Sequence, residues 1–392
     1  MKFNVFYNVS LLIAFTSVSY YLLVINSFIC STYHFVEYII PNLCMSVSKR
    51  NTSVSIISEE LYFNDFCEYL CSSNLEYICH TYHLSKPFVF TFYEEGGNGD
   101  AVTTLYPVPR DRRMRMDMKK AYWKQKSENP YLPSAQELKE IVNSHVSFFV
   151  ARQESLLLNP INSSLYTVQV GDLSIHEEFW KLIYDHEFLT SYLFQNFSLF
   201  PRILGTCKNF YAVQYAKPLI GNPLFPLSIP TQTKIQKAIE LLSFIRKLNL
   251  AWLEPIHLCD IKHDHFGWLN GEVLFLDLDC VVTDSALKDI FVNNPECTVN
   301  EDCSYFDCYG ECLPNKRCSK KRKNTNLQVL CSKIFLGNSE SSIMGLYGLL
   351  SGNEFSNALK EALEVCAINP GMTVEVLVEI LQNEYKSTTS LL

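Results

Sequence analysis

Two groups of charged side chains within residues 258–283 have the spacing of a phosphoryl-transfer site. In the first group, Lys262 follows Asp260 by two residues and His265 follows it by five. The second group is Asp277, which comes after an apolar run at 273–276 that reads as a buried strand. In phosphoryl transfer one carboxylate orients or deprotonates the attacking hydroxyl, and another holds the metal ion that bridges the nucleotide phosphates. This order predicts such chemistry, and the simpler alternative is two solvated acids beside an ordinary hairpin.

The dipeptide Asn270-Gly271 lies between the two groups and is a strong signal for a two-residue β-hairpin turn. A hairpin at this point would return the chain to the loop that carries Asp260. We therefore expect Asp277 to lie next to Asp260.

The composition limits the classes of protein and partner. With 392 residues, of which 48% are hydrophobic, the chain can form two to three domains or one large two-lobed domain. Its net charge is −8, so it has no overall basic field that would attract nucleic acid. We expect no nucleic-acid partner.

The N-terminal region predicts a membrane anchor. Residues 10–30 carry no charge and match the ~20 apolar residues that a membrane-spanning helix needs. A cleaved signal peptide is the competing interpretation, but its apolar core is usually only ~7–15 residues long. We favour an uncleaved signal anchor, with residues 1–9 in the cytoplasm, residues 31–60 as a lumenal stem and the bulk of the chain in the lumen.

The cysteine content fits an oxidising compartment. The chain has fifteen cysteines and no Cys-x-x-Cys pair, which favours disulfides over zinc sites. The odd number leaves at least one thiol unpaired, for which Cys30 is the easiest candidate. The disulfide candidates are Cys67, Cys71, Cys79, Cys297, Cys303, Cys308, Cys312, Cys318 and Cys331. Glycosylation sequons begin at Asn51, Asn162 and Asn196.

Several segments have clear secondary-structure signals. Composition predicts a strand over 87–93, a helix over 177–195 and two short strands within 201–216 around Lys208-Asn209. Periodicity predicts amphipathic helices over 134–150 and 231–249 and two helices within 351–384, the first capped by Ser351 and Glu354. The glycine-rich residues 96–99 read as an ordinary flexible loop, because no helix pattern follows them.

Residues 166–177 have the outline of an EF-hand calcium loop without its ligands. Gly171 and Glu177 occupy the sixth and twelfth positions. The first, third and fifth positions hold Tyr166, Val168 and Val170, where a calcium site needs oxygen ligands. We expect no calcium here.

Together these features resemble the divergent protein kinase domain 1 family, which comprises cysteine-rich, type II transmembrane kinase-like proteins of the endoplasmic reticulum. The resemblance is best over 173–216, LCDIKHDHFGW (258–268), VLFLDLD (273–279) and NLQVLCSKIF (326–335). It implies an α+β, two-lobed protein-kinase-like fold with a degenerate EF-hand insert, preceded by the transmembrane helix. The implied domains are a cysteine-rich smaller lobe at 61–216 and a larger lobe at 217–392 with a disulfide-rich segment at 297–331.

The resemblance implies ATP with magnesium or manganese as cofactor. Asp260 and Lys262 match the catalytic-loop residues, and Asp277 matches the metal-binding aspartate. His265 stands where the family pattern has a metal-binding asparagine, and imidazole is a poor ligand for magnesium. The strand at 88–93 holds Thr91 and no lysine at its end, so the lysine that anchors the nucleotide is missing. The helix carboxylates that would pair with that lysine, and so help to bind the cofactor, are Glu137 and Glu140.

Three functional hypotheses follow. The first is a pseudokinase in the membrane of the endoplasmic reticulum that binds or scaffolds a lumenal protein partner. The second is an active atypical kinase that transfers phosphate from ATP through Asp260 and Asp277. The third is a disulfide-rich adhesion protein without kinase ancestry, in which Asp260 and Asp277 would lie far apart. The missing lysine and His265 favour the first.

Overall fold

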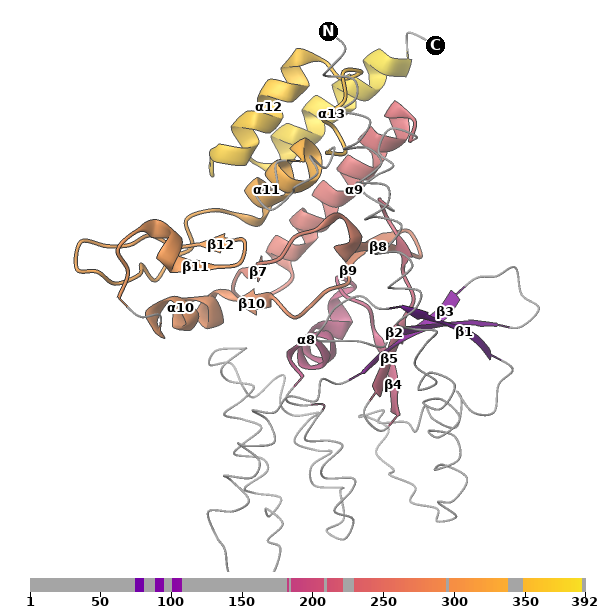
Figure 1. Ribbon diagram of the computed structural model, residues 1–392. Coiled ribbons are helices and arrows are strands. Elements are labelled where there is room, and N and C mark those ends of the chain that lie inside the picture. Colours follow the sequence, from indigo (N-terminus) through magenta and orange to yellow (C-terminus); the bar gives the residue numbers. More distant parts are fainter. Residues whose placement is uncertain are drawn as a thin grey trace, which may run out of the picture. The chain divides into compact units, whose positions relative to one another are not determined.

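The computed structural model describes residues 75–80, 89–94, 101–107, 182, 185–207, 210–220, 229–293, 296–337 and 348–389 (Figure 1). Within these ranges no helix has both the length and the apolar character that crossing a bilayer requires. Several predicted features lie outside the described residues. They are the anchor at 10–30, the stem at 31–60, the helix at 134–150 with Glu137 and Glu140, the loop at 166–177, Cys30, Cys67, Cys71, Asn51 and Asn162.

The described residues belong to two compact units. One unit contains an antiparallel five-stranded sheet with the order β1-β2-β3-β5-β4. Its strands are β1 (Leu75–His80), β2 (Val89–Glu94), β3 (Ala101–Pro107), β4 (Ile203–Cys207) and β5 (Phe210–Gln214). The strand predicted over 87–93 and the pair predicted around Lys208-Asn209 are therefore confirmed.

Strand β3 was not predicted. It pairs antiparallel with β2, so a strand follows the glycine-rich residues 96–99, where the sequence predicted a flexible loop without a helix after it. In the sheet β3 lies between β5 and β2, the strand that holds Thr91. None of the five strands contains a lysine.

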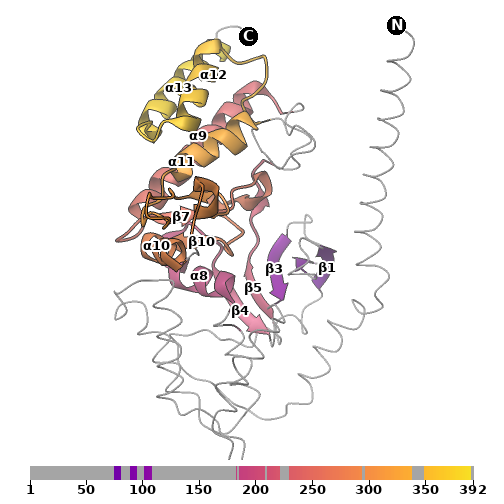
Figure 2. The same cartoon turned by 60° about the vertical axis from the view of Figure 1, so that its left-hand side comes forward.

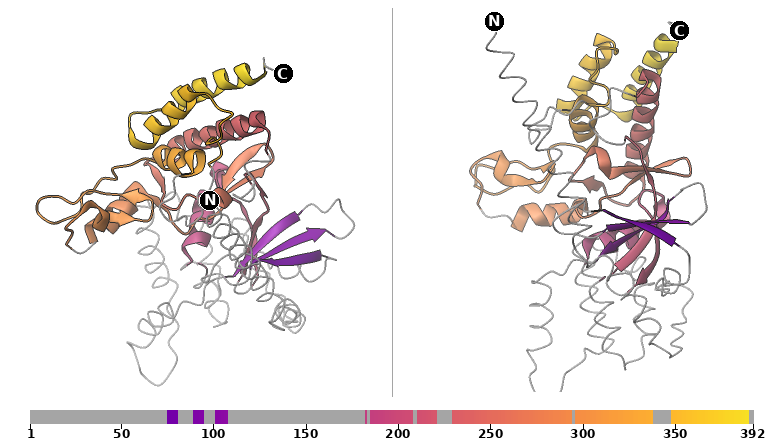
Figure 3. Two further views of the ribbon diagram at one scale, coloured as in Figure 1. Left: turned by 45° about the horizontal axis from the view of Figure 1, so that its top comes forward. Right: turned by 45° about the vertical axis from the view of Figure 1, so that its right-hand side comes forward.

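The core of the second unit forms around α9 (Thr231–Leu250), the helix predicted over 231–249. Ile235, Ala238, Leu242 and Ile245 lie at helical spacing and are fully buried, and Ile239 on the same predicted face is partly buried. Helix α13 (Val374–Thr389) packs along α9, as Figures 1 and 3 show. The other helices of this core are α8 (His186–Phe194), α11 (Asn326–Val329) and α12 (Asn357–Ile368).

The two predicted C-terminal helices are present as α12 and α13, but the predicted cap of the first is wrong. The chain reaches its first helical residue only at Asn357, beyond Glu354. Ser356 is the cap, and its hydroxyl accepts a hydrogen bond from the backbone N–H of Leu359 at 3.2 Å. A serine hydroxyl can satisfy only the unpaired N–H groups of the turn that directly follows it, so Ser351 is too far upstream.

Short strands of the second unit surround the predicted site. Strand β6 (Lys217–Pro218) pairs with β8 (Phe266–Leu269), and β8 pairs with β9 (Glu272–Phe275). The predicted hairpin turn between β8 and β9 is confirmed, because Asn270 and Gly271 have φ angles of 52° and 87°. Positive φ at both positions is the geometry that favours Asn-Gly there.

Four disulfides stabilise the second unit: Cys259–Cys308, Cys297–Cys312, Cys303–Cys318 and Cys331–Cys366. All six candidates from the segment 297–331 are therefore disulfide-bonded, but the partners Cys259 and Cys366 were not predicted. Among the cysteines whose side chains the structure describes, the unpaired thiol is that of Cys280, which is buried. Cys79 lies on β1.

Candidate metal and phosphoryl-transfer site

Pairing of two short strands brings the two groups of charged residues together. Strand β7 (Ile256–Leu258) leads into the Asp260 loop, and β10 (Val281–Thr283) follows Asp277. The two strands are antiparallel, and the N–H of Cys259 continues the pairing with a 3.0 Å bond to the carbonyl of Cys280. The β8–β9 hairpin closes the other side, since the N–H of Leu276 donates to the carbonyl of His265 at 2.8 Å.

The resulting site contains the predicted residues Asp260, Lys262, His265 and Asp277. Potential ligand atoms of Asp260, His265 and Asp277 all lie within 4.8 Å of one another. The His265 Nε2 atom lies 3.1 Å from a carboxylate oxygen of Asp277, and the Lys262 ammonium lies 2.7 Å from the Asp260 carboxylate. His265 is buried, whereas the Asp277 side chain is about a third exposed. Solvent can therefore reach the carboxylate that would hold a metal ion.

The hydrogen bonds of His265 indicate what Nε2 can do. Its Nδ1 atom lies 2.9 Å from the backbone carbonyl of Asp260, and a carbonyl oxygen can only accept, so Nδ1 carries the proton. In the neutral ring Nε2 then carries a lone pair and can only accept a hydrogen bond. It faces the Asp277 carboxylate, which is also an acceptor. Two facing acceptors need a proton or a metal ion between them. In metal-binding histidines, the ring nitrogen that does not bind the metal often donates a hydrogen bond to a backbone carbonyl, as Nδ1 of His265 does here.

Lys262 remains cationic in this site. Burial lowers the pKa of Lys262, but its hydrogen bond to Asp260 and the nearby charges of Asp260, Asp277 and Asp264 outweigh burial and raise that pKa above its usual value. The ammonium therefore offsets part of the negative charge that the carboxylates concentrate here. It also fixes one oxygen of Asp260.

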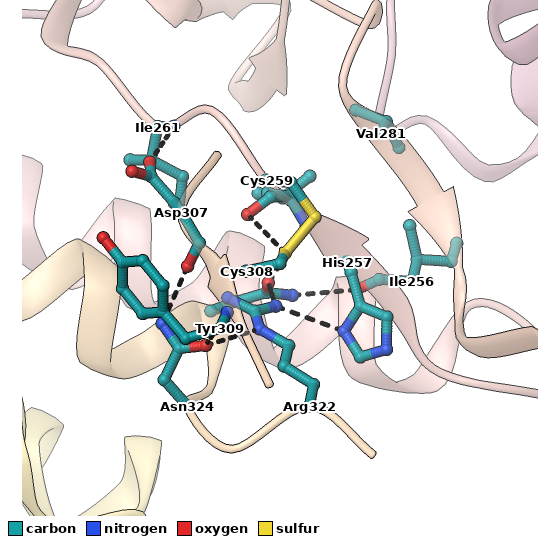
Figure 4. Close-up of a disulfide and its surroundings, with 12 residues drawn as sticks. Ile256, His257, Cys259, Ile261, Val281, Asp307, Cys308, Tyr309, Arg322 and Asn324 are labelled. Carbon is teal, nitrogen blue, oxygen red and sulfur yellow. Dashed lines mark hydrogen bonds between the residues drawn. A yellow bond between two sulfur atoms is a disulfide. The ribbon is translucent and has the colours of Figure 1, made fainter. Parts of the chain in front are cut away.

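The loop that carries Asp260 is anchored from the disulfide-rich segment (Figure 4). The carboxylate of Asp307 accepts a hydrogen bond from the N–H of Ile261 at 2.8 Å and is held by the Lys333 ammonium at 2.7 and 2.8 Å. The Cys259–Cys308 disulfide adds a covalent tie one residue before Asp260. Because Ile261 lies directly between Asp260 and Lys262, these contacts fix the backbone of both.

A buried polar cluster supports strand β7 beneath this loop. The side chain of Asn326 pairs with the backbone of β7, accepting from the N–H of Leu258 at 3.0 Å and donating to the carbonyl of Ile256 at 2.8 Å. Arg322 donates to Nδ1 of His257 at 3.2 Å (Figure 4). It also donates to Asn326 at 2.6 Å. Burial lowers the pKa of Arg322 to about 10, so the guanidinium still carries its charge at neutral pH.

The same cluster predicts a pH-dependent stability. Arg322 can only donate, so Nδ1 of His257 must be unprotonated, and Nε2 then donates to Asp284 at 3.0 Å. Burial and then the charge of Arg322 lower the pKa of His257, against the opposing effects of Asp284 and Glu254. Below about pH 6.5 the unfolded chain therefore binds a proton that the folded chain still excludes, and the free energy of unfolding falls.

Urea unfolding between about pH 7 and about pH 5 measures this effect. His257→Gln should make the decline in unfolding free energy shallower, because the titrating ring is gone. Burial also lowers the pKa of His263, so part of the decline should persist in the variant. An unchanged slope in His257→Gln would contradict the assignment.

Four of the predicted site residues thus meet in one place, which contradicts the adhesion-protein hypothesis, since that required Asp260 and Asp277 to lie far apart. The sequence analysis did not identify Asp307 and Lys333. Neither residue belongs to a recognisable motif, and they meet the Asp260 loop only in the folded chain. Cys259 carried a usable signal, because a cysteine next to Asp260 in a disulfide-rich protein predicts a covalent tie to that loop.

Comparison with known families agrees with this geometry. Residues 179–369 match the family described as the protein-kinase domain of FAM69. The match includes the Asp260 loop, the β8–β9 hairpin, Asp277 and all four disulfides of the described residues. Over residues 179–369 the chain thus matches a divergent protein kinase family, in agreement with the family that its sequence resembles.

Proposed function

We propose that this protein is a kinase-like binding module of the secretory pathway, whose site takes a divalent transition metal together with nucleotide phosphates. The observation that carries the proposal is the buried imidazole of His265 with Nε2 directed at the Asp277 carboxylate at 3.1 Å. One nitrogen and one carboxylate oxygen suit manganese or zinc better than magnesium, which prefers oxygen ligands throughout. When bound, such an ion supplies positive charge to the phosphates.

The missing lysine favours binding over efficient phosphoryl transfer. No lysine occurs in any of the five strands of the first unit, so none offers the ammonium that pairs with nucleotide phosphates in protein kinases. A charge of this kind, held in a water-excluded site, contributes several kcal/mol to transition-state stabilisation (~3 kcal/mol for one donor). We therefore favour a pseudokinase that scaffolds a protein partner.

A lumenal, membrane-anchored location in the endoplasmic reticulum is part of the proposal. Four disulfides in the described residues suit an oxidising compartment. Asn196 of the third sequon is exposed in the short helix η1 (Gln195–Phe197), where a glycan can be attached. The uncharged residues 10–30 would supply the anchor.

Thermal unfolding of the purified full-length protein with manganese or magnesium, with and without ATP, tests the metal site. Manganese at about 100 times its Kd should stabilise the folded protein by about 2.7 kcal/mol. Asp277→Asn should abolish this stabilisation. Asp289→Asn is the matched control, because Asp289 is an exposed aspartate on α10 (Asp284–Asn293). Equal manganese stabilisation of the two variants would refute the proposal.

An active atypical kinase is the second candidate, and the Lys262–Asp260 contact favours it. The 2.7 Å contact fixes one oxygen of Asp260, which leaves the other to orient an acceptor hydroxyl. Metal-dependent transfer of phosphate from ATP that Asp260→Asn abolishes, while manganese binding persists, would support this candidate. Binding of manganese without such transfer would instead support the scaffolding function.

A further inference from the structure

The disulfide-rich segment carries a concentrated basic surface in a chain of net charge −8. Residues 316–323 contain six basic side chains and no acidic one. Five of them are exposed, and we call these five the cationic face: Lys316, Arg317, Lys320, Lys321 and Lys323. In Figures 1 and 3 the segment with β11 (Ser304–Tyr305) and β12 (Cys308–Tyr309) projects from the second unit beside α10. The cationic face is therefore accessible to a partner.

The cationic face is held in a fixed shape. The disulfides Cys297–Cys312 and Cys303–Cys318 cross-link the segment that carries it. The turn before it is closed by a 2.9 Å bond from the N–H of Lys316 to the carbonyl of Leu313, with Lys316 in the left-handed region at φ 57°. The side chain of the sixth basic residue, Arg322, points inward to His257 (Figure 4) and also donates to Asn326, so it ties the run to the core. A rigid surface loses little conformational entropy when it binds a partner.

The basic side chains of the cationic face have no acidic partner among the residues that the structure describes. Within the described part of the chain none of its five residues forms an ion pair. The exposed acids of the segment all precede Cys312 in sequence, and the Asp302 carboxylate is already bonded to the N–H groups of Thr298 and Val299. Unpaired like charges on one rigid segment favour an anionic partner.

Two exposed apolar side chains lie among these cations. Tyr309 is 45% exposed and its carbonyl accepts the N–H of Lys323 at 2.7 Å. Leu313 is 38% exposed and its N–H donates to the carbonyl of Arg317 at 2.9 Å. The backbone bonds hold each apolar side chain beside a basic residue. A partner that alternates acidic and apolar side chains would match this surface.

We infer that the cationic face, with Tyr309 and Leu313, is a docking site for an acidic protein segment with interspersed apolar residues. An extended anionic membrane surface fits less well, because it would also meet the exposed acids Glu301 and Glu311 of the same segment. A polyanionic glycan matches the cations but offers no apolar side chain that would cover Leu313. A short peptide can follow the cations and cover the apolar residues.

This inference deepens the proposed scaffolding function, because it names the chemistry of the partner. The docking site contains no residue of the metal site, so an experiment can refute either proposal without refuting the other. Loss of manganese binding in Asp277→Asn should leave peptide binding unchanged, and loss of peptide binding should leave manganese stabilisation unchanged.

The test uses the full-length protein and a fluorescent peptide that alternates glutamate and leucine. Fluorescence anisotropy gives its Kd for the wild type and for the triple variant Lys316→Gln, Lys320→Gln, Lys323→Gln. The matched control neutralises three exposed basic residues elsewhere: Arg246→Gln, Lys288→Gln and Lys386→Gln. Because each exposed charge contact contributes modestly, we expect about tenfold weaker binding in the first variant and an unchanged Kd in the control.

A second pair of measurements separates the competing partners. Tyr309→Ser with Leu313→Ser should weaken binding of the glutamate–leucine peptide and leave binding of heparin unchanged. Vesicles of phosphatidylcholine and phosphatidylserine should bind more weakly than the peptide. The inference is overturned if the peptide does not bind, if both charge variants lose binding equally, or if vesicles or heparin bind through the cationic face and the peptide does not.

Discussion

Replacing Cys259 and Cys308 together by serine should lower the free energy of unfolding by about 4 kcal/mol and weaken metal binding. The disulfide closes a loop of 49 residues, and the loss of chain entropy in the unfolded state gives the stability figure. The metal effect has a separate cause, because Cys259 directly precedes Asp260. Without the covalent tie, the loop that carries Asp260 and Lys262 becomes less ordered.

The Cys331–Cys366 disulfide provides the matched control. It spans 35 residues, so its removal should cost about the same free energy of unfolding, about 4 kcal/mol. It joins η5 (Leu330–Leu336) to α12 and contains no residue of the Asp260 loop. Urea unfolding and manganese titration of both serine pairs measure the two effects. Equal manganese affinity in the two variants would show that the Cys259 tie does not position the site.

Asp307→Ala should lower the free energy of unfolding by about 3 kcal/mol. The substitution removes the partner of a partly buried Lys333 ammonium and leaves the N–H of Ile261 without its acceptor. Removing one member of a buried ion pair costs about 3–5 kcal/mol, and the Lys333 side chain is 23% exposed, which places the cost at the low end.

Asp307→Asn separates the two contributions. The amide oxygen can still accept from Ile261 but carries no charge for Lys333, so this variant should fall between the wild type and Asp307→Ala. Asp289→Ala is the surface control and should change stability by less than about 0.5 kcal/mol. Thermal unfolding of the four proteins gives the comparison. Equal stability of Asp307→Ala and Asp289→Ala would mean that the anchor of the Asp260 loop contributes nothing.

Local sequence signals predicted the parts of the site that depend on local structure. The Asn270-Gly271 turn adopts the φ angles that its residue types favour. Helix α9 buries Ile235, Ala238, Leu242 and Ile245 of its predicted apolar face, whereas Ile239 on that face is only partly buried. A two-residue turn and an amphipathic helix need no information from distant residues. The convergence of Asp260 and Asp277 followed from the hairpin for the same reason.

Local sequence signals did not predict the long-range contacts. Cysteine spacing cannot identify pairs, so Cys259 and Cys366 were not assigned as partners. Asp307 and Lys333 were missed because they meet each other and the Asp260 loop only in the folded chain. Strand β3 was missed because Ala101–Pro107 has a weak pattern and forms its ladder with β5, which lies more than a hundred residues later.

The central claim is that His265 and Asp277 form a site for a transition metal, and metal preference tests it most directly. Isothermal titration calorimetry of the full-length protein in the presence of ATP gives the Kd of manganese and of magnesium. We expect the wild type to bind manganese at least about tenfold more tightly than magnesium, since manganese is a transition metal that accepts an imidazole ligand more readily than magnesium does. His265→Asn should weaken manganese binding and strengthen magnesium binding. The same manganese-to-magnesium ratio in the wild type and in His265→Asn would contradict the claim.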